Sequence, residues 1–95
     1  MAAAYLAERG GTIVGRNVRA GRGEIDVVMR IGSQLVAVEV KTRVAGDPRP
    51  AYTAEKADHV WEAVRLLKPR PSRVDLVTVE LTARGAAIRW MPGVR

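Results

Sequence analysis

Four charged residues on two neighbouring strand-like segments have the types and the spacing of a shared divalent-cation site. Glu24 and Asp26 lie in the first segment, and Glu39 and Lys41 lie in the second. Carboxylate oxygens are the ligands that Mg²⁺ and Mn²⁺ select in proteins. A lysine beside them adds a positive charge that can contact an anionic substrate or orient a water molecule. These residues therefore predict a divalent-metal site that acts on an anion.

The turn between the two segments decides which residues face each other. Glycine and serine at positions 32–33 suit a two-residue hairpin turn. This turn predicts Asp26 directly opposite Glu39 and Glu24 directly opposite Lys41, all on one face of the hairpin. Two carboxylates on such positions, about 4.5–5.5 Å apart at Cβ, repel each other unless they share a cation. The alternative interpretation is a solvated hairpin face on which charges alternate.

The composition limits what else the chain can be. Its 95 residues support one small domain, and 47% apolar residues predict a packed core. The absence of cysteine and the single histidine exclude disulfides, cysteine-bound zinc and a histidine metal centre. No apolar run approaches the roughly 18 residues of a membrane span, so we expect a cytoplasmic protein that does not enter a membrane. Any metal must therefore be held by oxygen.

The charge balance favours a polyanionic partner. Lysine and arginine number 16 against 10 acidic residues, a net charge of +6, and 13 of the 16 are arginine. Arginine is the usual residue for phosphate contacts. Four arginines lie near the predicted site in sequence, and we expect them to contact phosphates, with simple solubility as the alternative. These are Arg16, Arg19, Arg22 and Arg43.

Hydrophobic periodicity and turn residues predict the elements that must position these side chains. The order is α-β-β-β-α-β-β, which predicts an α/β domain with one mixed sheet flanked by two helices. The expected elements are a helix over 2–9, a strand over 12–16, a loop over 17–23, strands over 24–31 and 34–42, a linker over 43–50, a helix over 53–68 with Thr53 as N-cap, a strand over 73–81, a turn at 83–85 and a strand over 87–91.

Several motifs together resemble the PD-(D/E)XK nuclease superfamily. Within it the chain is most similar to the YraN-type family of small bacterial proteins, which are themselves similar to archaeal Holliday-junction resolvases. The resemblance covers about residues 2 to 80. The residues that carry it are Gly23-Glu-Ile-Asp26, Val38-Glu-Val-Lys-Thr-Arg43 with Glu39 thirteen positions beyond Asp26, Tyr5-Leu6, Gly10, Ile13, Arg16-Asn-Val-Arg19, Lys56 and Arg73-Val-Asp-Leu-Val77.

The resemblance implies roles for the residues of the predicted site. Asp26 and Glu39 would bind Mg²⁺ or Mn²⁺, helped by the backbone carbonyl of Val40. Lys41 would position the attacking water or stabilise charge on the phosphate. Glu24 would support Lys41 or act as an auxiliary carboxylate, with a strand-edge salt bridge as the alternative.

The resemblance also implies a fold and a reaction. The fold would be an αβββαβ restriction-endonuclease-like core with an extra C-terminal strand, spanning residues 1–95 as a single domain. The family carries a glutamate before its Tyr-Leu pair, at a position that falls at or before Met1 here. We therefore expect the domain to lack the start of its first helix. The reaction would be metal-dependent hydrolysis of phosphodiester bonds in DNA, including branched DNA.

Two other interpretations of the function stay open. The first is a non-catalytic nucleic-acid-binding domain that keeps the nuclease fold. The second is an interaction module that forms a homodimer through a sheet edge or a tryptophan surface. Outside the site, Lys56 is expected near the substrate or in solvent, and Asp75 is expected to pair with an arginine. Trp61 and Trp90 are expected in the core or an interface.

Overall fold

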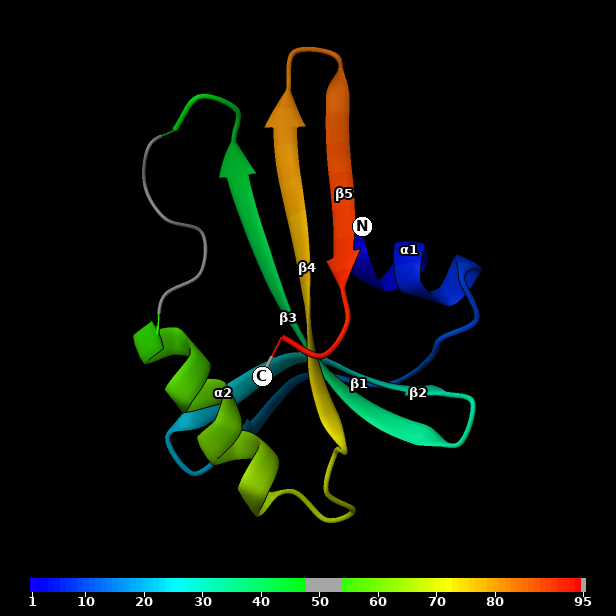
Figure 1. Cartoon of the computed structure of the whole chain (residues 1–95), viewed down its shortest axis with the longest axis vertical. Helices are drawn as coiled ribbons and strands as arrows, with labels where there is room; N and C mark the ends of the chain where they lie inside the picture. Colours follow the sequence, from blue (N-terminus) through cyan, green and yellow to red (C-terminus); the bar gives the residue numbers. More distant parts are fainter. Residues whose placement is uncertain (48–53, 95) are drawn as a thin grey trace.

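A computed structural model describes residues 1–47 and 54–94, with the side chains of 54–57 outside the described part. The elements follow the predicted order, two helices and five strands, and Figure 1 shows how they are arranged. The elements are α1 (Ala2–Glu8), β1 (Thr12–Ala20), β2 (Gly23–Ile31), β3 (Gln34–Val44), α2 (Ala54–Leu66), β4 (Arg73–Thr82) and β5 (Gly85–Met91).

The strands form one sheet in the order β1-β2-β3-β4-β5. β3 and β4 are parallel, and α2 lies between them in the sequence, as a parallel crossover requires. The pairs β1–β2, β2–β3 and β4–β5 are antiparallel hairpins. The predicted mixed α/β sheet with two helices is therefore confirmed.

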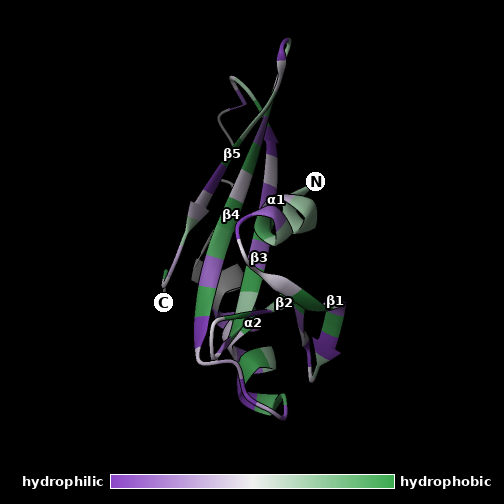
Figure 2. Cartoon of the chain, turned by 90° about the vertical axis from the view of Figure 1, so that its right-hand side faces the viewer, coloured by the Kyte–Doolittle hydropathy of each residue, from purple (hydrophilic) through white to green (hydrophobic). Residues whose placement is uncertain are grey.

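The two helices pack on opposite faces of this sheet. Ala2 and Leu6 of α1 share a core cluster with Val36 and Val38 of β3. The side chain of Ala37, between these two valines, instead joins a second cluster with α2. Because neighbouring strand residues point to opposite faces, α1 and α2 lie on different sides of the sheet. Figure 2 shows the hydrophobic and hydrophilic bands that follow one another along β4.

Two predicted connections are strands in the structure. The predicted loop over 17–23 is wrong, because β1 continues to Ala20 and pairs with β2 up to Gly23. Asn17 fits within the strand at a φ of 51°, a value that asparagine tolerates better than most residues. The predicted start of the linker at Arg43 is also wrong, since Arg43 and Val44 pair with β4. Positions 48–50 of that linker and the proposed N-cap Thr53 lie outside the described residues.

The remaining boundaries differ by a few residues. α2 ends at Leu66, whereas the sequence predicted position 68. β5 begins at Gly85, two residues before its predicted start, because Thr82 already pairs with Gly85 across the turn. Neither helix in the described part of the chain is long and apolar enough to cross a membrane.

Gly23 brings α2 close to the start of β2. A Cβ at this position would lie 2.2 Å from the backbone oxygen of His59 and 2.9 Å from the Cβ of Ala63. Only glycine fits such a close approach between a helix and a strand. The glycine of the Gly-Glu-Ile-Asp motif therefore sets the position of α2 beside the acidic residues that follow it.

Candidate functional site

The strands β2 and β3 separate at the predicted site. Their pairing runs from Ile31–Gln34 to Val27–Val38, in the predicted register, and no pair is formed at Asp26. The predicted direct opposition of Asp26 to Glu39, and of Glu24 to Lys41, is therefore wrong. Instead, the backbone N–H of Val40 donates a hydrogen bond of 2.8 Å to Oδ2 of Asp26.

A change in the facing of β2 explains this separation. Ile25 packs in the cluster on the α2 side, whereas Val27 packs in the cluster on the α1 side. In a regular strand these two side chains would point to the same face. The side chains of β2 therefore change faces at Asp26. There the Asp26 carboxylate, in place of a backbone oxygen of β2, accepts the N–H of Val40 in β3.

Glu39 is the most buried carboxylate of this constellation, with 6% of the residue exposed. Its Oε1 lies 2.8 Å from Nζ of Lys41. Its Oε2 is buried and accepts no hydrogen bond. Burial raises the pKa of the Glu39 carboxyl, the hydrogen bond from Lys41 opposes this rise, and the charge of nearby Asp26 adds to it. The two carboxylates therefore lie close enough to repel each other.

An open cleft of about 210 Å³ gives access to these groups. Glu24, Glu39 and Lys41 line it from the strands, and Arg22 lines it from the β1–β2 turn. His59 and Val60 of α2 complete the wall. Sequence reasoning gave no role to these two helix residues. The close approach of α2 at Gly23 places them here, and no local sequence pattern reports that contact.

The predicted basic residues do not all reach the cleft. Arg22 lines it, with Nε 3.6 Å from Oε1 of Glu62. Arg19 lies on β1 with Nε 3.7 Å from Oε2 of Glu24, the strand-edge ion pair given above as the alternative for Glu24. Arg16 is exposed on β1. The side chain of Lys56, in α2, lies outside the described part.

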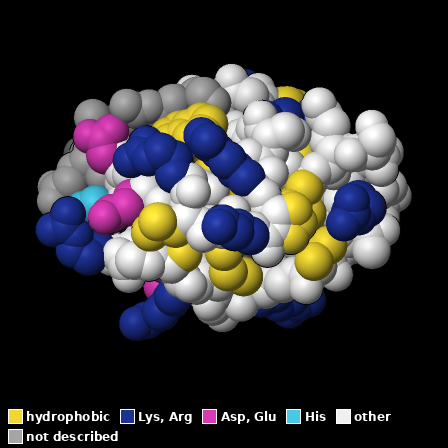
Figure 3. All heavy atoms as spheres, turned by 90° about the horizontal axis from the view of Figure 1, so that it is seen from below, with side chains coloured by type: hydrophobic (Ala, Val, Ile, Leu, Met, Phe, Trp, Pro, Cys, Tyr) yellow, Lys and Arg dark blue, Asp and Glu magenta, His cyan; other side chains and the backbone are white. Residues whose placement is uncertain are grey.

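The side chain of Arg43 lies on β3, two residues beyond Lys41. Its guanidinium donates to the backbone oxygen of Asp47, and its Nε lies 3.8 Å from Oε2 of Glu80. Basic side chains are also spread over other surfaces. Figure 3 shows lysine and arginine side chains at separate points on the face seen from below, with hydrophobic side chains between them.

The residues around Asp26 fit a hydrated divalent cation that keeps much of its water. Within the described residues no group of three or more His, Cys, Asp or Glu side chains comes together, so the protein offers two carboxylates. The unpartnered Oε2 of Glu39 is one available oxygen. The carbonyl of Val40 is another, because it points to the same side of β3 as the N–H bound to Asp26. Mg²⁺ is usually bound through one or two carboxylates and several waters.

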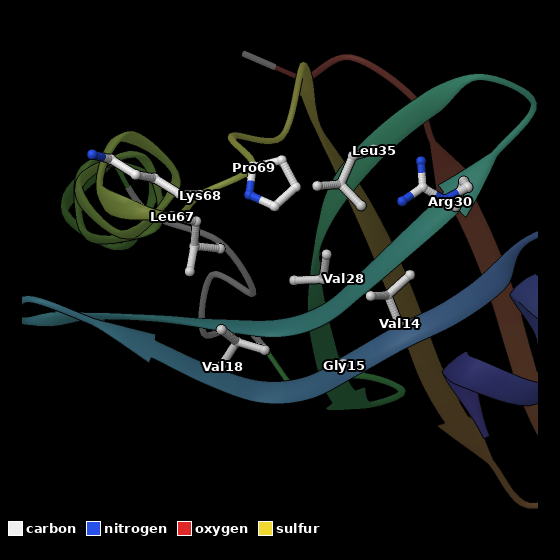
Figure 4. Close-up of a pocket in the computed structure, with 9 residues that line it drawn as sticks. All are labelled: Val14, Gly15, Val18, Val28, Arg30, Leu35, Leu67, Lys68 and Pro69. Atoms are coloured by element: carbon white, nitrogen blue, oxygen red, sulfur yellow. The ribbon is translucent and has the colours of Figure 1, made fainter.

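A second cleft, of about 270 Å³, is apolar. It lies between β1, β2, β3 and the end of α2, and Figure 4 shows its lining. Leu35 and Pro69 are among its apolar residues, and Arg30 and Lys68 are its only charged ones. Its lining contains no carboxylate, so it offers no metal ligands and is not a candidate for the hydrolytic chemistry.

Asp75 is acidic and buried but belongs to a structural cluster. Its two oxygens accept hydrogen bonds from Arg73, from Nε1 of Trp90 and from the backbone N–H of Gly93, each within 2.9 to 3.0 Å. The predicted pairing of Asp75 with an arginine is confirmed. Asp75 pairs with Val38 of β3, which packs on the α1 side, so Asp75 lies on the opposite face of the sheet from Glu39.

Comparison with known proteins identifies the family. The sequence model of the Uncharacterised protein family UPF0102 matches residues 1–79. A UPF0102 protein of Solibacter usitatus is 42% identical over 100 residues, covering 94% of this chain and 75% of the relative. Another, from Streptomyces coelicolor, is 42% identical over 99 residues, covering 93% and 76%. A third, from Leifsonia xyli, is 40% identical over 105 residues, covering 99% and 88%. The chain therefore belongs to the UPF0102 family.

Proposed function

We propose that this protein is a divalent-metal-dependent nuclease that hydrolyses phosphodiester bonds in DNA, on a restriction-endonuclease-like core of the PD-(D/E)XK type. The observation that carries the proposal is the proximity of Asp26, Glu39 and Lys41, with Glu39 and Lys41 lining one cleft and Oε2 of Glu39 left without a partner. The order of the first six elements, α-β-β-β-α-β, agrees with that core. The β5 strand is then the extra C-terminal strand.

Each residue of the candidate site has a separate task in this proposal. Asp26 and Glu39 would hold Mg²⁺ or Mn²⁺ together with the carbonyl of Val40. When bound, such a cation would lower the pKa of a water and polarise the phosphate. Lys41 is held by Oε1 of Glu39 at 2.8 Å, so its ammonium group is fixed beside the carboxylates. From there Lys41 orients the attacking water or stabilises the negative charge that develops on the phosphate.

Arg22, which lines the cleft, and Arg19, on the neighbouring strand β1, supply substrate contacts. The side chains of Arg19 and Arg22 are 82% and 89% exposed, and their acidic partners lie 3.7 and 3.6 Å away. Exposed ion pairs of this kind contribute little to stability. DNA phosphates can therefore replace Glu24 and Glu62 as partners at a small cost. Glu24 acts here as a counter-ion of Arg19 and not as a metal ligand.

Cleavage and metal binding test the proposal together. Linear, flapped and four-way DNA are incubated with the protein in Mg²⁺ or Mn²⁺, and the wild-type protein is expected to cleave at least one of them. Glu39→Gln should lower the rate by about 10²–10³-fold, the range seen when a group that stabilises transition-state charge is removed. Glu8→Gln is the matched control, because Glu8 is exposed on α1 on the opposite face.

Thermal denaturation supplies a readout that does not depend on activity. Saturating Mn²⁺ at 100 times its dissociation constant should stabilise the wild-type protein by about 2.7 kcal/mol. Glu39→Gln should lose this stabilisation, whereas Lys41→Met should keep it while losing cleavage. Equal cleavage by wild type and Glu39→Gln would refute the catalytic assignment.

A non-catalytic nucleic-acid-binding domain is the second candidate function. The observation that favours it is the presence of only two carboxylates at the site, with no third acidic or histidine side chain joining them in the described part. This function predicts salt-dependent DNA binding without a thermal shift in Mn²⁺ and without cleavage. The metal titration therefore separates the two functions.

A further inference from the structure

The face of the sheet opposite α1 continues beyond the cleft onto β4 and β5. Lys41 of β3 is paired with Thr78 of β4, and Thr78 is paired with Arg89 of β5. On β5, the side chains of Ile88 and Trp90 pack against the α1-side cluster. Arg89, between them, therefore points to the same face as Lys41. Neighbouring strands lie about 4.8 Å apart, so Lys41 and Arg89 are about 10 Å apart across the sheet.

No helix in the described part of the chain covers this end of the face. α2 packs mainly against β2 and β1. In Figure 1, the upper ends of β3, β4 and β5 lie away from α2. The face carries a hollow of about 320 Å³ lined by Arg43, Thr78, Glu80, Ala87, Arg89 and Met91. The two arginines and the hydroxyl of Thr78 in its lining make it a candidate site for an extended anion.

The basic side chains of this hollow have hydrogen-bond donors without an acceptor. Nε of Arg43 is buried without a hydrogen-bond acceptor, since Oε2 of Glu80 stays 3.8 Å away. Lys41 is neutralised by Glu39, and Arg43 by Glu80. Arg89 is exposed and has no acidic partner among the described residues. Arg89 therefore carries an uncompensated positive charge at one end of the row Lys41–Thr78–Arg89, and the other end of the row lies at the candidate hydrolytic centre.

We propose that this face, from Lys41 across Thr78 to Arg89 with Arg43 beside it, binds the sugar-phosphate backbone of the DNA strand that enters the cleft. This inference rests on the proposed function, because it takes DNA as the substrate. One strand of DNA carries a charge about every 3.4 Å along the helix axis, so the row of about 10 Å spans about three phosphates. Arg43 and Arg89 contact phosphates, and the hydroxyl of Thr78 donates a hydrogen bond between them.

A polymer fits this arrangement better than a small anion. A single phosphate would need its donors to converge on one point, whereas Lys41 and Arg89 lie on strands separated by β4. The strand that carries Arg89 also lies beyond residues 1–79, where the family match ends. Arg89 thus adds a contact outside the matched region and extends the substrate path away from α2.

DNA binding in EDTA tests the inference without any cleavage. Fluorescence anisotropy is measured with labelled single-stranded and duplex DNA over a range of salt concentrations. Arg89→Gln should weaken binding about 5- to 10-fold, and the slope of log K against log salt should fall by about 0.7 to 0.9, the loss of one phosphate contact. Arg89→Lys should keep most of the binding, because lysine keeps the charge. Circular dichroism verifies that each variant is folded.

Arg70→Gln is the matched control. It removes the same charge from the exposed loop before β4, away from the hollow, and should change binding less than 2-fold. If Arg70→Gln and Arg89→Gln weaken DNA binding equally, the inference is overturned, while the proposed nuclease function is not affected. Binding that depends on Arg89 in a protein that never cleaves DNA would support the inference and refute the hydrolysis. A wild-type protein that binds no DNA would refute both.

Discussion

Replacement of Asp75 separates the structural carboxylate of this protein from the two carboxylates of the candidate site. Asp75 is fully buried and accepts four hydrogen bonds, two from Arg73 at 2.9 and 3.0 Å, one from Trp90 at 2.9 Å and one from Gly93 at 2.9 Å. Asp75→Asn keeps the size of the side chain but replaces one acceptor oxygen by an amide nitrogen. That nitrogen would point its hydrogens at donors.

The contacts set the magnitude of the expected loss. A hydrogen bond to a charged group contributes about 1.5–3 kcal/mol, and removing one partner of a buried ion pair costs about 3–5 kcal/mol. The side chain of Arg73 is 28% exposed and also donates to Gln34, so water and Gln34 retain part of its solvation. We therefore expect Asp75→Asn to lose about 3 kcal/mol. For a domain of this size, that is a fall in Tm of roughly 12–24 °C.

Urea and thermal denaturation followed by circular dichroism measure this loss. Glu80→Gln is the control, because Glu80 lies on the same strand and its ion pair with Arg43 is half-exposed and 3.8 Å long. It should cost less than about 0.5 kcal/mol. The double variant Arg73→Met with Asp75→Leu should recover only part of the stability, since it leaves no buried charge unpaired but removes the acceptor of the N–H groups of Trp90 and Gly93. An Asp75→Asn protein within about 0.5 kcal/mol of wild type would refute the reasoning.

Two further perturbations test the site's surroundings. Burial raises the pKa of Glu39 in the folded protein above its ordinary value of 4.5. As the pH rises from 4.5 through the pKa of the folded state, the Glu39 carboxyl loses its proton first in the unfolded chain. The free energy of unfolding therefore falls over this pH range. Urea denaturation in EDTA should therefore show Glu39→Gln gaining stability relative to wild type from acid to neutral pH; a constant difference would contradict this. Gly23→Ala places a Cβ 2.2 Å from the oxygen of His59 and should cost about 1–3 kcal/mol, whereas a neutral effect would show that α2 does not approach β2 so closely.

Much of the fold was predictable because its signals are local. The β-branched runs of β2, β3 and β4, and the glycine turns at 32–33 and 83–85, fix the strands and their hairpins. The failure at β1 has a physical reason. Polar and apolar residues do not alternate regularly over positions 16–20, and this segment contains Asn17, so its sequence is typical of a loop. Pairing with β2 nevertheless makes it a strand, because β2 supplies the backbone hydrogen bonds.

The candidate site was predictable in its strand residues and not in its walls. The sequence places Asp26 on one strand and Glu39 and Lys41 on the next, and both Asp26 and Lys41 lie near Glu39, although not through the predicted pairing. Their neighbour His59 comes from a helix 20 residues further along the chain, and its place depends on the contact at Gly23. Such tertiary contacts have no periodic signal in one sequence.

The break in the β2–β3 ladder brings the Asp26 side chain to the backbone of β3 beside Glu39. If the predicted pairing had continued past Val27, a backbone oxygen of β2 could accept the N–H of Val40 in place of the Asp26 carboxylate. Instead, the side chain of Asp26 takes the N–H of Val40, and a buried oxygen of Glu39 stays unpartnered at the same gap. A buried acceptor without a donor costs about 1–3 kcal/mol, and folds tolerate such a cost mainly where function requires it. The unpaired Glu39 oxygen therefore supports the proposed cation site more directly than the acidic spacing alone.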